Sequence, residues 1–222
     1  MLFTFLAYIA YRMPLFVKKE LKDGAHLAIW KIEEDESTLR GALSLFPEEK
    51  QVLDSMRSSK SRLGHLAARV ALKSLLPPGE PVLSLKDPQG KPYLPEVPGH
   101  ISLSHSGIFG VAMMHATHPV GVDIELISDK INKVASKFLK KEERQYIKGI
   151  DALYAAWCIK ESAFKWYGKR GISLKENMRI LPTDFGTSPR LTLCLSDKDQ
   201  HFELSFGYEK IAGYMLAYIL ND

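Results

Sequence analysis

GVDIE at residues 121–125 is the stretch that most restricts the fold of this chain. Side chains alternate between the two faces of a β-strand, so Asp123 and Glu125 would share one face, and Val122 and Ile124 the other. The apolar face predicts a buried strand. A pair of acids on a buried strand needs a partner, because buried charges are paired or bind metal.

A second stretch, WCIKESAFK at residues 157–165, has helical character. Glu161 and Lys165 are four residues apart, which places them on one helix face. Aromatic residues surround this pair in the sequence, so we expect the helix to be largely buried. A glutamate on a buried helix is more often functional than one on an exposed helix.

Packing of this strand against this helix would bring three acids, Asp123, Glu125 and Glu161, close to Lys165. Acids so placed repel one another unless a cation lies among them. Ligands that are all oxygen suit a hard divalent ion, and Mg²⁺ commonly combines a few carboxylates with water and phosphate oxygens. The sequence therefore predicts a Mg²⁺ site that handles a phosphate ester.

Composition is that of a globular protein, with 222 residues, 45% hydrophobic residues and a net charge of +4. This mild positive balance suits an anionic substrate or an acidic partner. No dense basic run interleaved with aromatic residues predicts nucleic-acid binding. Cys158 and Cys194 form no disulfide or zinc motif, so a reducing, cytoplasmic location is expected.

The N-terminal stretch 2–17 is apolar but contains Arg12 and Pro14. It is too short and too interrupted for a membrane-spanning helix, and it lacks the features of a signal peptide. Met13 opens a plausible first segment, so residues 1–12 could reflect a mis-assigned start. We expect no membrane association.

The pattern of apolar residues predicts an α+β fold built from two similar halves. Residues 1–118 would form an N-terminal half, and residues 119–222 a C-terminal half that carries the metal-binding acids. Strands are predicted at 26–32, 100–103, 109–115, 120–126, 190–195, 202–208 and 213–219, and helices at 47–76, 130–139 and 142–167. This order of elements indicates a duplicated unit, although no residue-level repeat is visible.

Other residues fit a phosphate site. His105 lies between two serines in SHSG at 104–107, at a tight junction between two strands, and this setting suits a phosphate ligand. Lys60, Arg62 and Arg69 lie on the first long helix and would hold a remote phosphate if that helix lines the site. The chain has no Walker A loop, no G-x-G-x-x-G and no G-x-S-x-G.

Four blocks in order, GKPY at 90–93, SHSG at 104–107, GVDIE at 121–125 and WCIKESAFK at 157–165 followed by Gly168-Lys169, resemble one known family. It is the 4′-phosphopantetheinyl transferase superfamily, in its larger, surfactin-synthetase-activating type. The last two blocks are the specific ones.

The resemblance implies a pseudo-dimer of two α+β halves with the active site in the cleft between them. It also implies coenzyme A as donor, Mg²⁺ as cofactor, and a serine of an apo acyl or peptidyl carrier protein as acceptor. A monomer would complete its own cleft, so a monomer is expected. Fatty-acid, polyketide, nonribosomal-peptide and aminoadipate-reductase carriers all offer the same serine.

By this resemblance, each site residue acquires an expected role. The metal ligands are Asp123, Glu125 and Glu161, and the pyrophosphate contacts, which are also catalytic, are His105 and Lys165. Residues expected near the coenzyme A nucleotide and its 3′-phosphate are Lys60, Arg62, Lys91 and Ser104. Glu161 is also expected to accept the serine proton.

Two other functions would use the same acids. One is a Mg²⁺-dependent nucleotide pyrophosphatase, which needs the carboxylates and Lys165 but no protein acceptor. The other is a non-catalytic module that binds coenzyme A or a carrier protein. Retention of all three acids and of the lysine favours an enzyme.

Overall fold

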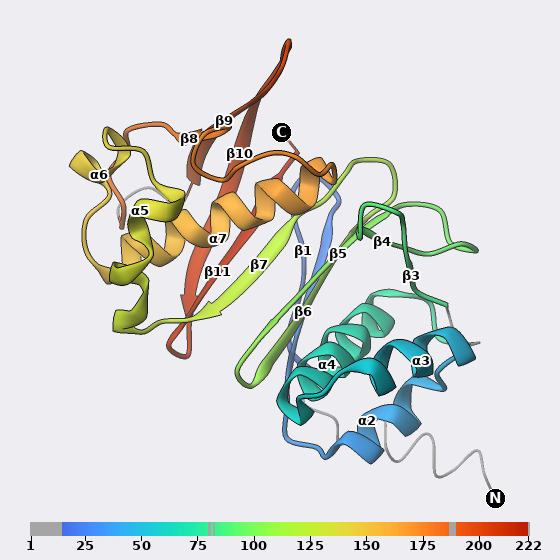
Figure 1. The fold of residues 1–222 in the computed structure, drawn as a ribbon. Coiled ribbons are helices and arrows are strands. Elements are labelled where there is room, and N and C mark those ends of the chain that lie inside the picture. The colour runs from blue at the N-terminus through green and yellow to red at the C-terminus, as the bar shows by residue number, and fades with distance from the viewer. Residues whose placement is uncertain (1–14, 80, 82, 187–189, 222) are drawn as a thin grey trace, which may run out of the picture.

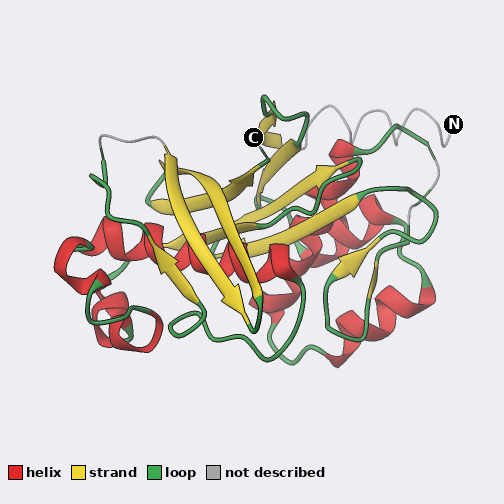
Figure 2. Cartoon of the chain, turned by 90° about the horizontal axis from the view of Figure 1, so that it is seen from above, coloured by secondary structure: helices red, strands yellow, loops and turns green. Residues whose placement is uncertain are grey.

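The computed structural model describes all residues except 1–14, 80, 82, 187–189 and 222, and it contains two large antiparallel sheets and a short ribbon (Figure 1). Figure 2 shows the strands in the middle of the molecule and helices at both sides. This mixture of helix and sheet confirms the predicted α+β class. The considered start at residues 1–12 lies outside the described residues.

The first sheet has the strand order β1-β2-β6-β5. Its strands are β1 (Leu15–Glu20), β2 (His26–Lys31), β5 (His100–Ser106) and β6 (Phe109–His115). Three helices accompany it: α2 (Glu36–Leu43), α3 (Pro47–Ser55) and α4 (Ser59–Leu75). α4 packs across β6 and β2 because its apolar face, which includes Leu66, Ala67, Val70 and Ala71, is buried in the core of this side.

The second sheet has the strand order β7-β11-β10-β9-β8. Its strands are β7 (Val122–Leu126), β8 (Met178–Ile180), β9 (Arg190–Asp197), β10 (Gln200–Ile211) and β11 (Tyr214–Leu220). The long helix α7 (Ile150–Tyr167) packs on β11 and β7, and Ala155, Ile159 and Ala163 are fully buried in this contact. Short helices η1 (Asp129–Lys133), α5 (Ala135–Phe138) and α6 (Glu143–Tyr146) precede α7.

The edge strands β5 and β7 bring the two sheets together. They lie side by side in Figure 1, and residues of both strands are in contact. β5 carries the SHSG block at its end, and β7 carries Asp123 and Glu125. The ribbon of β3 (Leu85–Lys86) and β4 (Pro92–Tyr93) lies next to β5 and carries the GKPY block. Three of the four sequence blocks therefore lie along the line where the sheets meet.

Two predicted helices are interrupted. The helix predicted at 47–76 divides into α3 and α4, because Met56 is extended and Ser58 caps α4 by accepting the Ser61 N–H at 3.3 Å. The helix predicted at 142–167 divides into α6 and α7 at Gly149, which has φ +85°. The stretch predicted as a helix at 130–139 forms η1 and α5 instead of one element.

The sequence analysis did not predict β1, α2 or β8. All seven strands that it did predict are present, with shifts of a few residues at their ends. Within the described part of the chain, no helix has the length and apolar character needed to cross a membrane.

Candidate active site

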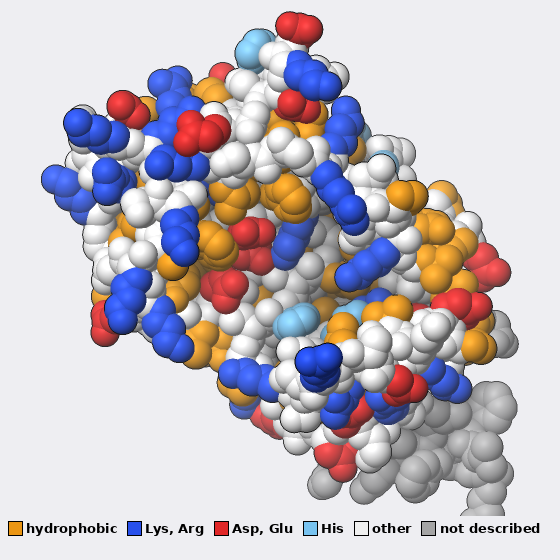
Figure 3. All heavy atoms as spheres, viewed as in Figure 1, with side chains coloured by type: hydrophobic (Ala, Val, Ile, Leu, Met, Phe, Trp, Pro, Cys, Tyr) orange, Lys and Arg blue, Asp and Glu red, His pale blue; other side chains and the backbone are white. Residues whose placement is uncertain are grey.

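The two acids of GVDIE, Asp123 and Glu125, lie close enough to Glu161 of α7 to affect its charge. Val122 and Ile124 are fully buried in the core, so the alternation of β7 turns Asp123 and Glu125 to the opposite face. Lys165 reaches across from α7 and donates to Asp123 Oδ1 at 2.8 Å and to the Val122 carbonyl at 3.0 Å. Lys165 therefore connects the strand with the helix at the predicted site. Figure 3 shows acidic side chains in a hollow near the centre of the face of the molecule that is in view.

The acids perturb one another. Burial, followed by the charge of Asp123 and then Glu125, raises the pKa of Glu161 to about 7, while Lys165 opposes this shift. Burial and Asp123 likewise raise the pKa of Glu125. This pattern is the one expected when carboxylates share a site that a cation would neutralise.

One carboxylate oxygen is left without a partner. Asp123 is buried, and its Oδ1 accepts from both Lys165 and Ser104, but its Oδ2 is buried with no hydrogen bond to any described residue. A buried oxygen in this state is costly unless a ligand binds it.

Serine hydroxyls of β5 hold the two acids of β7. Ser104 Oγ donates to Asp123 Oδ1 at 2.7 Å, and Ser106 Oγ donates to Glu125 Oε2 at 2.9 Å. These bonds cross from the first sheet to the second. The acid face of β7 is therefore positioned by both sides of the molecule.

A pocket of about 270 Å³ adjoins the acids and shares Lys165 with them. Its walls include apolar residues of both sides, among them Ala68, Ile101, Leu103 and Phe164. Cations or histidines surround the space: His65, Arg69, Lys86, Lys91, His105, Lys165 and Lys169. A pocket with this lining is suited to a large anion that carries phosphate groups and an apolar portion.

The ribbon β3–β4 fixes Lys91. Asp87 Oδ1 accepts the N–H groups of Gln89 and Lys91 at 2.9 and 2.8 Å, which closes the turn. Lys91 Nζ then donates to the Trp166 carbonyl of α7 at 2.8 Å, and burial lowers the pKa of Lys91. This lysine connects the pocket wall with the end of α7.

His105 is positioned by close packing against α4. A Cβ built on Gly64 would lie 2.5 Å from His105 Nδ1, so only glycine at this place lets the imidazole lie against the helix. Burial and the charge of Lys165 lower the pKa of His105. His105 and Lys165 both line the pocket.

Two predicted nucleotide contacts lie away from the pocket. Arg62 donates to Glu36 Oε2 at 2.9 Å and to the Met56 carbonyl at 2.8 Å, and Lys60 is exposed. Neither residue lines the pocket, and the hydroxyl of Ser104 is engaged with Asp123. The structure brings Arg69 to the pocket instead, one of the α4 cations considered from the sequence.

The sequence analysis did not predict His65, Lys86 or Lys169 as site residues. His65 is buried, its Nε2 has no hydrogen-bond partner among the described residues, and burial together with Arg69 lowers its pKa to about 3. The signal available in the sequence was the spacing of His65 and Arg69, four residues apart on one helix face.

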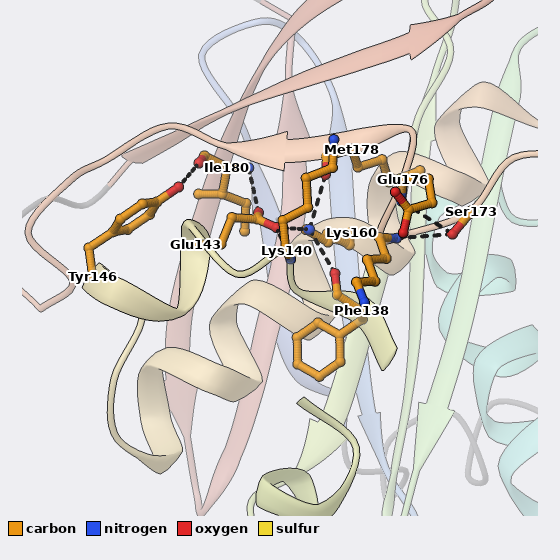
Figure 4. Close-up of polar contacts among 10 residues, drawn as sticks. Phe138, Lys140, Glu143, Tyr146, Lys160, Ser173, Glu176, Met178 and Ile180 are labelled. Atoms are coloured by element: carbon orange, nitrogen blue, oxygen red, sulfur yellow. Dashed lines mark hydrogen bonds and ion pairs between the residues drawn. The ribbon is translucent and has the colours of Figure 1, made fainter. Parts of the chain in front are cut away.

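The residue next to Glu161 anchors α7 from behind. Lys160 points away from the site and donates to Glu143 Oε2 at 2.8 Å, to the Phe138 carbonyl at 2.8 Å and to the Met178 carbonyl at 3.1 Å (Figure 4). Both charged side chains of this pair have an exposed fraction of 0%. The pair fixes the rotation of the helix that presents Glu161.

The residues present fit a divalent metal ion in their donor chemistry. In the part of the chain that the structure describes, no three His, Cys, Asp or Glu side chains form a ready-made metal cluster. The unpartnered Asp123 Oδ2 and the raised pKa values of Glu125 and Glu161 nevertheless mark carboxylates that a hard cation would stabilise.

Carboxylates suited to a cation thus lie beside a cation-lined pocket suited to phosphate groups. Comparison with known proteins narrows the functions that fit these residues. Residues 119–219 match the family model of the 4′-phosphopantetheinyl transferase superfamily.

Curated relatives agree with the family model. The chain is 34% identical over 117 residues to the 4′-phosphopantetheinyl transferase gsp of Aneurinibacillus migulanus, which covers 50% of this chain and 48% of that protein. It is 34% identical over 92 residues to the 4′-phosphopantetheinyl transferase Sfp of Bacillus subtilis (strain 168), which covers 38% of this chain and 40% of that protein. The matches thus span less than half the length of these relatives.

These comparisons confirm the resemblance predicted from the four sequence blocks. The matched residues 119–219 include Asp123, Glu125, Glu161 and Lys165, so the part of the chain that carries the acids is the part that is similar to this superfamily.

Proposed function

We propose that this protein transfers the 4′-phosphopantetheine group of coenzyme A to a serine of an apo acyl or peptidyl carrier protein. The observation that carries the proposal is the double position of Lys165, which pairs with Asp123 and also lines the pocket. A donor phosphate held in the pocket would therefore lie beside the acid cluster. The superfamily match over residues 119–219 supports this reaction rather than another phosphoester chemistry.

The pocket residues would bind the donor. Arg69, Lys86 and Lys91 offer charge to the phosphates, and Ile101 and Phe164 offer apolar surface. Lys165 and His105 lie nearest the acids and would stabilise charge that develops on the pyrophosphate. The pseudo-dimer predicted from the sequence accounts for this layout, because each half contributes one wall.

Asp123, Glu125 and Glu161 would hold Mg²⁺, which supplies positive charge against the phosphate oxygens. Positions on two elements suit this role, with two acids on β7 and one on α7. Lys165 also neutralises part of this negative charge through its ion pair with Asp123.

The transfer step balances in atoms and charge. The serine oxygen of the carrier attacks the β-phosphorus of coenzyme A and forms a new P–O bond. The bond from this phosphorus to the bridging oxygen breaks, and 3′,5′-ADP leaves with the electron pair. Glu161 would accept the serine proton, directly or through one water, because a carboxylate whose pKa is raised to about 7 is suited to act as a general base.

We also propose that the protein acts as a monomer in the cytoplasm. Cys158 and Cys194 are free thiols, which supports a reducing compartment. The pocket draws residues from β5 of the first sheet and from α7, which packs on the second sheet, so no second copy is needed to complete it.

The test is the release of 3′,5′-ADP from coenzyme A with and without an apo carrier protein. We expect release only when Mg²⁺ and the apo carrier are both present, and no release with a carrier whose acceptor serine is alanine. Release without an acceptor would assign the chain to the pyrophosphatases. Binding of coenzyme A without release in any mixture would assign it to the non-catalytic modules.

A further inference from the structure

The joint between the two sheets is built from serine side chains. β5 pairs with β6 along one side, while Ser102, Ser104 and Ser106 meet β7 on the other. Their hydroxyl oxygens accept the backbone N–H groups of Val122 at 3.1 Å, Ile124 at 3.4 Å and Leu126 at 3.2 Å. Each bond joins residues 20 apart in the sequence, so β5 and β7 run in the same direction. In a regular parallel pair the backbone carbonyls would accept these N–H groups, and here the serine hydroxyls accept them instead.

Each hydroxyl also has one hydrogen to donate. Ser104 donates it to Asp123, and Ser106 donates it to Glu125 at 2.9 Å. The same two serines therefore bind the edge of β7 and hold its acids. A shift of one sheet against the other would move these carboxylates as well.

Ser102 occupies the same kind of position but has no acid to hold. Asp123 lies opposite Ser104 and Glu125 lies opposite Ser106, and the residue in the same position opposite Ser102 is Gly121. A Cβ on Gly121 would lie 2.0 Å from the Ser162 carbonyl oxygen of α7. No side chain is tolerated there. Ser102 thus contributes to the joint without holding an acid, which makes it a control for Ser106 when metal binding is measured without coenzyme A, although Ser102 also lines the pocket.

We propose that Ser106 is a positioning residue that holds Glu125 in the orientation required for metal binding. This inference rests on the metal site of the proposed function. Among the described residues, no lysine donates to Glu125 as Lys165 donates to Asp123, and Ser106 is the partner of Glu125 across the joint. Loss of the hydroxyl would free the carboxylate to adopt other rotamers, and partners of ligating carboxylates commonly affect metal affinity by about tenfold or more.

The experiment compares Ser106→Ala, Ser106→Thr and Ser102→Ala with the wild-type protein. Binding of Mn²⁺ is measured by calorimetry on the full chain without coenzyme A, and thermal unfolding is measured without metal. We expect Ser106→Ala to weaken Mn²⁺ binding about tenfold, and Ser106→Thr to restore it to within about threefold.

The matched control, Ser102→Ala, should lose more stability and less Mn²⁺ affinity than Ser106→Ala. Ser102→Ala leaves the buried Val122 N–H unpaired, whereas Ser106→Ala leaves the exposed Leu126 N–H, which water can bind. Ser102→Ala should therefore lower the melting temperature more, while changing Mn²⁺ affinity less than about threefold. A purely structural role of Ser106 would move both readouts together.

Three results would overturn the proposal. They are unchanged Mn²⁺ affinity in Ser106→Ala, an equal loss in Ser102→Ala, and no recovery in Ser106→Thr. Absence of Mn²⁺ binding to the wild-type protein would overturn both this inference and the metal part of the proposed function. Normal binding to wild type and to Ser106→Ala would overturn this inference alone.

Discussion

Two lysine–carboxylate pairs on α7 have the same N–O distance of 2.8 Å and entirely different surroundings. Lys160 and Glu143 have exposed side-chain fractions of 0% and 0%, whereas Lys165 and Asp123 have fractions of 26% and 6%. The first pair lies behind the helix and the second lies in the site. Distance alone does not distinguish a structural ion pair from a functional one.

The two pairs differ in how many of their polar atoms have hydrogen-bond partners. The ammonium of Lys160 has an acceptor for each of its three N–H bonds, and Glu143 also accepts the N–H groups of Lys140 and Ile180. Asp123 retains a buried oxygen with no hydrogen bond to a described residue, and neighbouring Glu161 has its pKa raised to about 7. We call Lys160–Glu143 the saturated pair, because its hydrogen-bonding groups have partners, and this pair stabilises the fold. The Lys165–Asp123 pair keeps an oxygen that a ligand can bind.

Breaking the saturated pair should have the largest effect on stability. Lys160→Met leaves Glu143 buried without its cation, and loss of one partner of a buried pair costs about 3–5 kcal/mol of unfolding free energy. Chemical denaturation measures this loss. Lys210→Met is the control, because the Lys210–Asp151 pair has the same 2.8 Å distance but is more than half exposed, and it should cost less than about 1 kcal/mol.

The pair in the site should respond in the reverse manner. Lys165→Met is expected to reduce the rate of phosphopantetheine transfer by about a hundredfold, because the lysine stabilises charge at the reacting phosphate. Its unfolding free energy should fall by less than that of Lys160→Met, because Lys165 has an exposed fraction of 26% whereas Lys160 has one of 0%. A large loss of stability with a small loss of rate would remove the distinction between the two pairs.

Glu161→Gln should make the metal-free protein more stable at high pH. The pKa of Glu161 rises from 4.5 to about 7 on folding, so the folded state favours the protonated acid. The native protein therefore loses stability as the pH rises through this range, and the uncharged glutamine does not. We expect an advantage of about 1–2 kcal/mol at pH 8 that disappears below about pH 4.5. Denaturation of both proteins across this range measures it, and an equal difference at every pH would contradict the shift.

Gly64→Ala should have the smallest effect. The new Cβ would meet His105 Nδ1 at 2.5 Å and turn the imidazole from its place against α4. Because alanine favours a helix, the stability should not fall by more than about 1 kcal/mol. We expect KM for coenzyme A to rise about three- to tenfold, and steady-state kinetics with His105→Ala as reference would check it. An unchanged KM would show that the position of His105 does not matter for donor binding.

The acids that share a face within each element could be predicted, because a shared face depends on short-range periodicity, whereas the contact between strand and helix joins residues 42 apart. Alternation along 121–125 and helical spacing along 157–165 are fixed by backbone geometry, so Asp123, Glu125 and Lys165 lie where the sequence indicates. These shared faces need no knowledge of distant contacts. The end of the strand before SHSG was predicted wrongly, at residue 103, whereas β5 continues to Ser106.

The pocket wall could not be predicted in the same way. Arg62 and Arg69 both lie on α4, and the choice between them depends on Glu36, which is 26 residues from Arg62 and pairs with it outside the pocket. The partners of Lys160 could not be predicted from the sequence either, because Glu143 and the two carbonyl groups come from separate segments. Such tertiary contacts override local pattern.

The most direct test of the central claim is the intact mass of an apo carrier protein after incubation with this protein, coenzyme A and Mg²⁺. The account predicts a gain of one phosphopantetheinyl group, which is abolished by EDTA and by Glu161→Gln and is retained in Lys210→Met. An unchanged carrier mass across several unrelated apo carriers, with a folded protein, would contradict the proposed transferase function.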